Sequence, residues 1–164
     1  MGAIAWPAKF APLVLIAGIV TSCAFGAPST FILESASVDQ SYVCPTAASD
    51  LAYAIHATID VRNGTSSTVQ IRSVVAVMTL AAVKGGWLEH VGDKYQAAGV
   101  TVSPTSVAAG SRATLMVTIP STCTNGKAPS SGASYGDYSV TLAVATSSGT
   151  HTIVSRNRHR IVAA

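Results

Sequence analysis

One stretch of the chain, residues 51–62, alternates apolar and polar side chains without a break. The odd-numbered positions are Leu51, Tyr53, Ile55, Ala57, Ile59 and Val61, and the even-numbered positions are Ala52, Ala54, His56, Thr58, Asp60 and Arg62. A repeat of two over this length is typical of a β-strand that buries one face and exposes the other. Asn63-Gly64-Thr65 follows, and an Asn-Gly pair tolerates the positive φ of a tight turn. The stretch therefore predicts a half-buried strand.

Strand patterns of the same kind recur along the chain, separated by turn residues. The other expected strands are 30–38, 69–83, 113–119, 138–145 and 150–162, whereas 39–50 and 121–134 are expected to be loops. The unbroken apolar run at 74–78 predicts a central strand covered on both faces, or one that extends into the next element. Pro120 is expected to end its strand, because proline cannot donate to a sheet ladder. The succession predicts an all-β fold, an antiparallel sandwich of about seven strands.

Residues 85–99 interrupt this succession. Trp87, Leu88, Val91 and Tyr95 recur at roughly helical spacing among polar and charged neighbours. The spacing favours one short helical or irregular excursion from the sandwich. The alternative is a short edge strand with a loop.

The N-terminus carries the pattern of an export signal. Residues 1–10 hold a single charged side chain, Lys9, and an apolar run follows over 11–20. This run is shorter than the ~20 apolar residues of a typical membrane-spanning helix. We therefore expect a signal peptide over 1–23, a linker over 24–28 and one folded domain over 29–164.

The end of the expected signal peptide allows two kinds of processing. Val20-Thr21-Ser22-Cys23 resembles the bacterial lipobox, in which the cysteine is lipidated and becomes the new N-terminus. Acylation of Cys23 would tether the domain to a membrane surface without making it span the membrane. The alternative is ordinary secretory cleavage after Ala24 or Gly26.

Composition limits the classes of function. Charged side chains make up 10% of the chain, against about 25% in an average soluble domain, so Ser, Thr and Asn supply its polar faces. Ten basic and seven acidic residues give +3, and loss of Lys9 with the signal leaves nine against seven, or +2. This charge is too small and too dispersed for a nucleic-acid-binding surface. The remaining chain of roughly 140 residues is large enough for one domain with a real core.

Three stretches together resemble bacterial immunoglobulin-like modules of the cell-adhesion-related and fibronectin-like kind. They are IHATIDVRNGT at 55–65, PTSVAAGSRATLMVT at 104–118 and YGDYSVTLAV at 135–144. The resemblance covers most of 29–162 and implies an immunoglobulin-like sandwich. It also implies that Tyr138 is a corner tyrosine whose hydroxyl bonds back to the chain. The departure lies at 85–99, where such modules often have two short strands.

The cysteines fit an exported protein. Of the three, Cys23 is lipidated or removed, which leaves Cys44 and Cys123 in a compartment that permits oxidation. In the fold that the chain resembles, the second and fifth strands are antiparallel neighbours. Cys44 precedes the second strand and Cys123 follows the fifth. The resemblance therefore implies a disulfide between them at one pole of the domain; two unpaired thiols are the alternative.

No motif for catalysis appears in the sequence. His-Glu-x-x-His, Cys-x-x-Cys, Gly-x-Ser-x-Gly and phosphate-binding glycine loops are all missing. Glu89, His90 and Asp93 offer metal ligands, but consecutive helical residues do not face each other and a third ligand is not identifiable. We therefore expect no catalytic residue, no cofactor and no metal site. Asn63-Gly64-Thr65 is also a glycosylation sequon, although the bacterial character of the signal argues against its use.

Two groups of residues are candidates for an interaction surface. Arg156, Arg158 and Arg160 repeat at every second position and so project from one face of the expected last strand. They predict a patch for an anion, lipid headgroups or an acidic partner, or else an edge strand protected by charge. Trp87 and Tyr95 predict an exposed recognition surface, or else a flap over the sandwich edge.

Together these patterns predict a non-catalytic, exported module that makes protein–protein contacts in a bacterial envelope or surface assembly. It would be lipid-anchored through Cys23, or periplasmic or secreted. The alternative is a carrier or inhibitor that holds a small ligand, a metal or a protease. A cleft gathering His90, Asp93 and another carboxylate would favour that alternative or an enzyme, whereas an exposed apolar patch would favour the contact module.

Overall fold

The structure is a computed structural model that describes residues 30–125 and 134–163. Within these ranges it contains eleven strands and no helix. The strands are β1 (Phe31–Val38), β2 (Ser41–Cys44), β3 (Leu51–Asn63), β4 (Val69–Lys84), β5 (Lys94–Gln96), β6 (Thr101–Ser103), β7 (Ser106–Val107), β8 (Arg112–Cys123), β9 (Ser134–Thr146), β10 (Gly149–Val154) and β11 (His159–Ala163). The all-β class is confirmed, although the strands are more numerous than expected.

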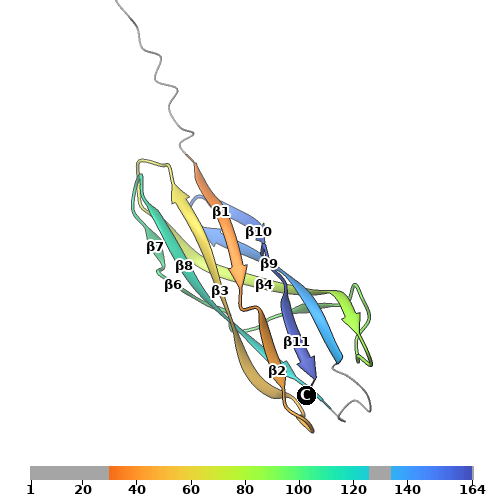
Figure 1. The fold of residues 1–164 in the computed structure, drawn as a ribbon. Coiled ribbons are helices and arrows are strands. Elements are labelled where there is room, and N and C mark those ends of the chain that lie inside the picture. The colour runs from red at the N-terminus through yellow and green to blue at the C-terminus, as the bar shows by residue number, and fades with distance from the viewer. Residues whose placement is uncertain (1–29, 126–133, 164) are drawn as a thin grey trace, which may run out of the picture.

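The strands form two sheets (Figure 1). The first sheet has the order β1-β3-β8-β6, and the second has the order β2-β11-β9-β4-β5, with β10 beside β9 and β7 beside β4. β2 and β11 run parallel, whereas the central pairs β3–β8 and β4–β9 are antiparallel. This order is that of an immunoglobulin-like sandwich, in which the first strand switches from one sheet to the other.

The alternation over 51–62 forms β3, between β1 and β8 in the first sheet. Its side chains Ile55, Ala57, Ile59 and Val61 are buried, as predicted. β9 buries its own alternating set, Tyr138, Val140, Leu142 and Val144. Both sets belong to one hydrophobic core between the sheets.

The apolar run in β4 is covered on one face. Val74, Ala76 and Met78 are buried in the core, whereas Val75 is 39% exposed. The expectation of a strand covered on both faces is therefore wrong. β4 is central in its sheet, but no second layer lies over its outer face within the described residues.

Pro120 does not end its strand. β8 continues past it to Cys123, and Pro120 itself pairs with Ala54 of β3. On the other side of β8, the pairing with β6 stops at Thr118. A missing N–H on that open side breaks no ladder bond, so the sheet tolerates the proline.

Two further boundaries depend on distant partners. The expected loop 39–50 contains β2, which pairs with β11 from the other end of the chain. The expected last strand breaks into β10 and β11. At this break the Asn157 side chain bonds the backbone N and O of Val38 at 3.0 and 2.7 Å, which ties the chain to β1.

Cys44 and Cys123 form a disulfide, with 6.0 Å between their Cα atoms. Cys44 ends β2 in the second sheet and Cys123 ends β8 in the first. Cys123 also pairs with Leu51, the first residue of β3. The pairing that the resemblance implied is therefore present, and it joins the two sheets at one pole.

A buried histidine lies near this pole. His159 is 1% exposed, and its Nδ1 donates to the carbonyl oxygen of Asp39 at 2.8 Å. Its Nε2 lies 3.4 Å from the hydroxyl of Tyr53, whose ring stacks on Tyr42. Burial lowers the pKa of His159 and raises the pKa of Tyr53 to about 12. Both side chains are therefore neutral in the folded protein at neutral pH.

We expect His159 to make the fold sensitive to mild acid. Its pKa in the folded state lies below the unfolded value of 6.5, so the unfolded chain binds the extra proton. The free energy of unfolding should therefore fall as pH drops below 6.5. The Arg160 guanidinium lowers the pKa of Asp137 below its ordinary value of 3.8. Protonation of Asp137 therefore lowers the free energy of unfolding only at a pH below 3.8, outside the range tested. Urea unfolding from pH 8 to pH 5, on the natural chain and on His159→Gln, should give the flatter profile for the variant; equal slopes would contradict this role.

Asn63 is a buried polar hub at the other pole. It has no exposed surface, and its Nδ2 donates to the carbonyls of Ser67, Val107 and Ala108 at 2.8–3.1 Å. Its Oδ1 accepts from the backbone N and the hydroxyl of Thr65. A glycan on this nitrogen is incompatible with the folded protein, because the atom is enclosed and fully engaged.

Removal of this hub should be costly. Asn63→Ala leaves buried carbonyls unpaired, and each such group costs about 1–3 kcal/mol. We expect a loss of about 2–4 kcal/mol in the free energy of unfolding, measured by urea titration. Asn63→Asp keeps the acceptor but sets a charge against those carbonyls, so it should be at least as damaging. A loss below about 1 kcal/mol in both variants would contradict the role.

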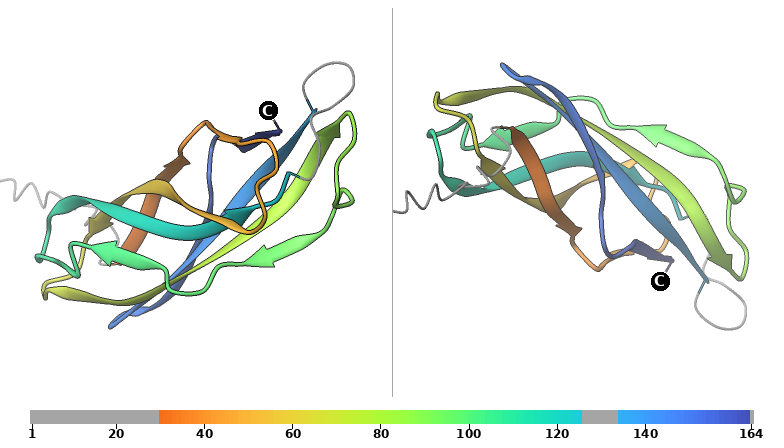
Figure 2. Two further views of the ribbon diagram at one scale, coloured as in Figure 1. Left: turned by 90° about the horizontal axis from the view of Figure 1, so that it is seen from below. Right: turned by 90° about the horizontal axis from the view of Figure 1, so that it is seen from above.

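The two poles carry different features. In Figures 1 and 2, the chain enters β1 at one end of the sandwich, and the turn after β4 lies at the opposite end. Gly64 at the entry end bonds Thr30 through its backbone N at 2.9 Å. A tether attached before Thr30 would therefore hold the entry end and leave the turn after β4 at the far end.

Candidate functional site

Residues 85–99, here called the edge segment, lie along the free edge of β4. β5 pairs with β4 in this segment, with Tyr95 opposite Met78. Backbone bonds join Gly92 and Asp93 to Leu80 at 2.8 and 2.9 Å. The helical interpretation of this segment is wrong, and the alternative of a short edge strand with a loop is confirmed. The free edge of β4 offers backbone hydrogen-bond partners to the edge segment, and the spacing of the segment's own residues does not reveal them.

Trp87 fixes the start of the edge segment. Its indole lies on Gly136 of β9, where an added Cβ would be 2.6 Å from the ring. Its Nε1 donates to the hydroxyl of Tyr138 at 3.2 Å, and that hydroxyl donates to the carboxylate of Glu89. Burial and the Glu89 carboxylate raise the pKa of Tyr138. The hydroxyl of Tyr138 thus bonds back to the chain, through side chains of the edge segment.

Gly136→Ala should release the edge segment. The added methyl group would overlap the indole of Trp87, so the ring must leave its site. The sequence has two tryptophans, and Trp87 is the one beyond the expected signal peptide, so its fluorescence reports this contact. We expect a red shift and faster quenching by iodide or acrylamide. Gly86→Ala is the matched control, because nothing lies within 4 Å of its added Cβ. Equal spectra for the two variants would contradict the contact.

The same segment exposes large apolar side chains. Leu88 is 76% exposed and Val91 is 60% exposed, and Tyr95 follows at 42%. We call Leu88 and Val91 the tip. Sequence analysis selected Trp87 and Tyr95 in this segment, and assigned Leu88 and Val91 only to a helical spacing. Gly85 and Gly92, which adopt positive φ, flank the tip and mark the turns on either side of it.

The polar residues of the edge segment do not gather into a metal site. Glu89 is engaged by Tyr138. The backbone N of His90 donates to Asp93 Oδ2 at 2.8 Å, and the His90 ring stands 3.9 Å from the same oxygen. Among the described residues, no three His, Cys, Asp or Glu side chains lie together as metal ligands.

The three arginines occupy different surroundings. Arg156 and Arg158 lie in the break between β10 and β11, and Arg160 lies in β11. Arg160 donates to both oxygens of Asp137 at 2.7 and 3.0 Å and covers the ring of Tyr135 at 3.9 Å. The backbone N of Arg156 bonds Ala36 of β1 at 2.9 Å. The three therefore do not share one regular strand.

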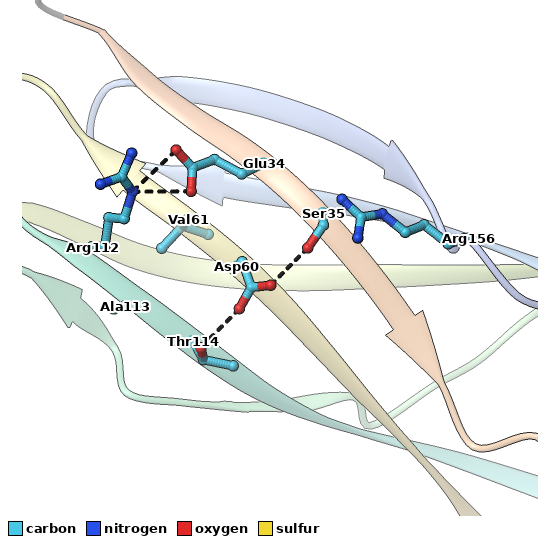
Figure 3. A pocket seen from close by; sticks show the side chains of 8 residues that line it. All are labelled: Glu34, Ser35, Asp60, Val61, Arg112, Ala113, Thr114 and Arg156. Atoms are coloured by element: carbon cyan, nitrogen blue, oxygen red, sulfur yellow. Dashed lines mark hydrogen bonds and ion pairs between the residues drawn. The ribbon is translucent and has the colours of Figure 1, made fainter.

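Arg156 borders an open depression of about 620 Å³ on the first sheet (Figure 3). At its centre Asp60 accepts hydrogen bonds from Ser35 and Thr114 at 2.7 and 2.8 Å. These two hydroxyls lower the pKa of Asp60. Arg112 lines the far side of the depression, and its Nε lies 3.3 Å from the Glu34 carboxylate oxygen Oε2. The carboxylates thus already have partners within the protein.

Comparison with known proteins assigns the chain to no family. No protein-family model matches the chain, and no curated protein matches it. Among solved structures, the chain is similar to the ASH/PapD-like domain of human CEP192 (PapD-like domain 7), with 17% identity, a TM-score of 0.30, and 93% of this chain and 96% of that one covered. It is also similar to the CooA pilin subunit from enterotoxigenic Escherichia coli, with 12% identity, a TM-score of 0.26, and coverage of 79% and 97%. Scores this low carry no argument about function.

Over 30–125 and 134–163, no helix has the length and apolar character needed to cross a bilayer. The expected signal peptide lies outside the described residues, as does Cys23.

Proposed function

We propose that this chain is a non-catalytic, exported immunoglobulin-like module that binds another protein through its tip. The observation that carries the proposal is the exposure of Leu88 and Val91, at 76% and 60%, on a segment that is otherwise fixed. Trp87, Tyr138 and Glu89 hold its start, and Leu80 holds its middle, at Gly92 and Asp93, through two backbone bonds. Buried contacts thus hold in place a loop whose aliphatic side chains are exposed to solvent.

The energetics of such a tip suit a protein contact. Burying a Leu or Val side chain contributes about 1.5–3 kcal/mol, so the pair supplies roughly 3–6 kcal/mol before any cost of association. A fixed backbone loses little entropy on binding, which preserves more of that gain. The tip is therefore an anchor for a larger contact, in which neighbouring residues such as Tyr95 supply the remaining area.

Export and anchoring belong to the same proposal. The apolar run at 11–20 and the lipobox-like Val20–Cys23 support a signal peptide ending at Cys23, and the Cys44–Cys123 disulfide suits an oxidising compartment. The tether from Cys23 to Thr30 spans seven residue steps and reaches about 25 Å at most, whereas the thirteen-residue β3 alone is roughly 40 Å long. An anchored domain standing on its tether would present the tip away from its own membrane, toward a partner.

Crosslinking in the producing cell tests the contact. A photoreactive amino acid at Leu88 or Val91 should give an adduct with one protein, identified by mass spectrometry. The matched control is Met116, which is also apolar and is 54% exposed, but lies on β8 in the first sheet. The adduct should also fall in Gly136→Ala, because the segment is released. Identical adducts from all three positions, or none from the tip, would overturn the proposal.

Mass spectrometry of the mature N-terminus tests the anchor. An acylated Cys23 supports the lipoprotein form, and a free Phe25 or Ala27 supports simple secretion. An N-terminus that retains the apolar run would contradict both.

A further inference from the structure

The end of the sandwich at which the chain enters β1, here called the entry pole, is built from short connections that bond one another. They are residues 64–68 between β3 and β4, 108–111 between β7 and β8, and 147–148 between β9 and β10. Gly110 N donates to Thr65 O at 3.3 Å, which joins the first connection to the second. Ser147 N donates to Gln70 O at 2.9 Å, which joins the third to the start of β4. The entry pole is therefore one fixed surface.

Arginines surround the entry pole. Arg62 and Arg112 lie opposite each other where β3 ends and β8 begins, and Arg72 lies near the start of β4. Arg112 pairs with Glu34 at 3.3 Å. The side chains of Arg62 and Arg72 form no hydrogen bond or ion pair within 30–125 and 134–163. Each therefore carries a positive charge that no carboxylate of the described chain neutralises.

Carboxylates are scarce around these arginines. The connections themselves contain only Ser, Thr, Ala and Gly. Beyond the paired Glu34, the next carboxylate along the sheet is Asp60, in the depression that Arg156 also lines (Figure 3). At the opposite end, the charged side chains of the described residues are Asp50, Glu89, Asp93 and Asp137 against Lys84, Lys94 and Arg160. The described domain is thus positive at the entry pole and slightly negative at the end that bears the tip.

We propose that the entry pole docks on the anionic surface of the membrane in which Cys23 is anchored, with Arg62 and Arg72 on lipid phosphates. This inference rests on the lipid anchor of the proposed function. The tether from Cys23 reaches about 25 Å at most. It ends at Thr30, whose carbonyl accepts a hydrogen bond from Gly64 of the entry pole at 2.9 Å. The anchor therefore holds this pole, and not the tip, beside the headgroups.

The charges need only orient a domain that the tether already keeps at the surface. One basic side chain beside an anionic leaflet favours the docked state about fivefold, so two favour it about 25-fold. Salt at about 0.1 M confines the attraction to about 10 Å, a distance that the tether spans. Guanidinium groups donate paired hydrogen bonds to phosphate, and the Ser and Thr hydroxyls between them add further donors. A domain docked in this way stands upright and presents the tip away from its own membrane.

Energy transfer on vesicles measures this orientation. The acylated chain is inserted into phosphatidylcholine vesicles, with or without about 30% phosphatidylglycerol, that carry an acceptor dye on a headgroup. The donor dye is attached through Ser66→Cys at the entry pole or Leu88→Cys at the tip, since Cys44 and Cys123 are joined. Phosphatidylglycerol should raise transfer from the entry pole and lower transfer from the tip. Salt at about 0.5 M should reverse both changes.

Removal of the two unpaired arginines should abolish the response to phosphatidylglycerol. Arg62→Gln/Arg72→Gln loses two charges at the entry pole, and Lys84→Gln/Lys94→Gln, the matched control, loses two at the opposite end. The control should respond as the natural chain does. Thermal unfolding identifies a variant that has lost its fold, and Arg72→Gln alone, which should weaken docking about fivefold, then decides.

The outcomes separate this inference from the proposed function. An acylated chain whose transfer is the same with and without phosphatidylglycerol would overturn the inference alone. A response lost equally in the arginine and lysine variants would also overturn it, because net charge and not the entry pole would then govern binding. A mature chain without an acyl group would overturn the inference together with the anchor. Failure of the tip to crosslink a partner has no bearing on docking.

Discussion

Ile55→Asp is expected to abolish folding. Ile55 lies at the centre of β3 with no exposed surface, between β1 and β8 and beneath the second sheet. Its loss removes about 1.5–3 kcal/mol of apolar burial, and the carboxylate that replaces it has no partner in the core. Together these effects cost about 5 kcal/mol or more, which equals the whole stability of many domains of this size.

The neighbouring position gives the control. Ala54 is the preceding residue of the same strand but faces solvent, so Ala54→Asp should cost no more than about 1 kcal/mol. Far-ultraviolet circular dichroism and thermal unfolding compare the two variants. If Ile55→Asp unfolded at the temperature of the natural chain, the assignment of the core face of β3 would be untenable.

Loss of the disulfide is expected to be the second largest effect. Cys44 and Cys123 are 79 residues apart in sequence, and cross-linking so long a loop contributes about 4–5 kcal/mol in the chain-entropy model. The bond also joins β2 of one sheet to β8 of the other, so the two layers lose their covalent link at this pole. Cys44→Ala/Cys123→Ala should therefore lower the urea midpoint strongly.

Two measurements check this result. Urea unfolding of the double alanine variant should match unfolding of the natural chain in the presence of reductant, because both lack the cross-link. Thiol titration of the unfolded, unreduced chain should find neither Cys44 nor Cys123 reactive. Two reactive thiols at these positions would show that the protein does not form the bond.

Sequence analysis succeeded where the pattern is local. Successive side chains of a strand point to opposite faces, so the buried apolar residues of β3 and β9 recur at every second position along the strand. The disulfide followed from the antiparallel neighbours that the resemblance implied.

The candidate interaction residues were harder to place. Trp87 carries the aromatic signal of a recognition residue, yet it packs on Gly136 and bonds Tyr138, 51 residues away in the chain. Leu88 and Val91 carry no special signal, yet they are the exposed pair. Hydropathy alone does not distinguish an apolar residue that is buried against other strands from one that stays exposed. That distinction depends on what other strands bring near.

A single strand's buried face and the all-β class were therefore accessible from the amino acids alone, because short-range periodicity encodes them, whereas the pairing of the two cysteines was implied by the resemblance. The extent of β2, the persistence of β8 beyond Pro120 and the break between β10 and β11 were not. Each depends on whether a neighbouring strand offers or lacks a hydrogen-bond partner at that position. The exposure of the tip has the same origin, since a surface exists only once the rest of the chain has packed elsewhere.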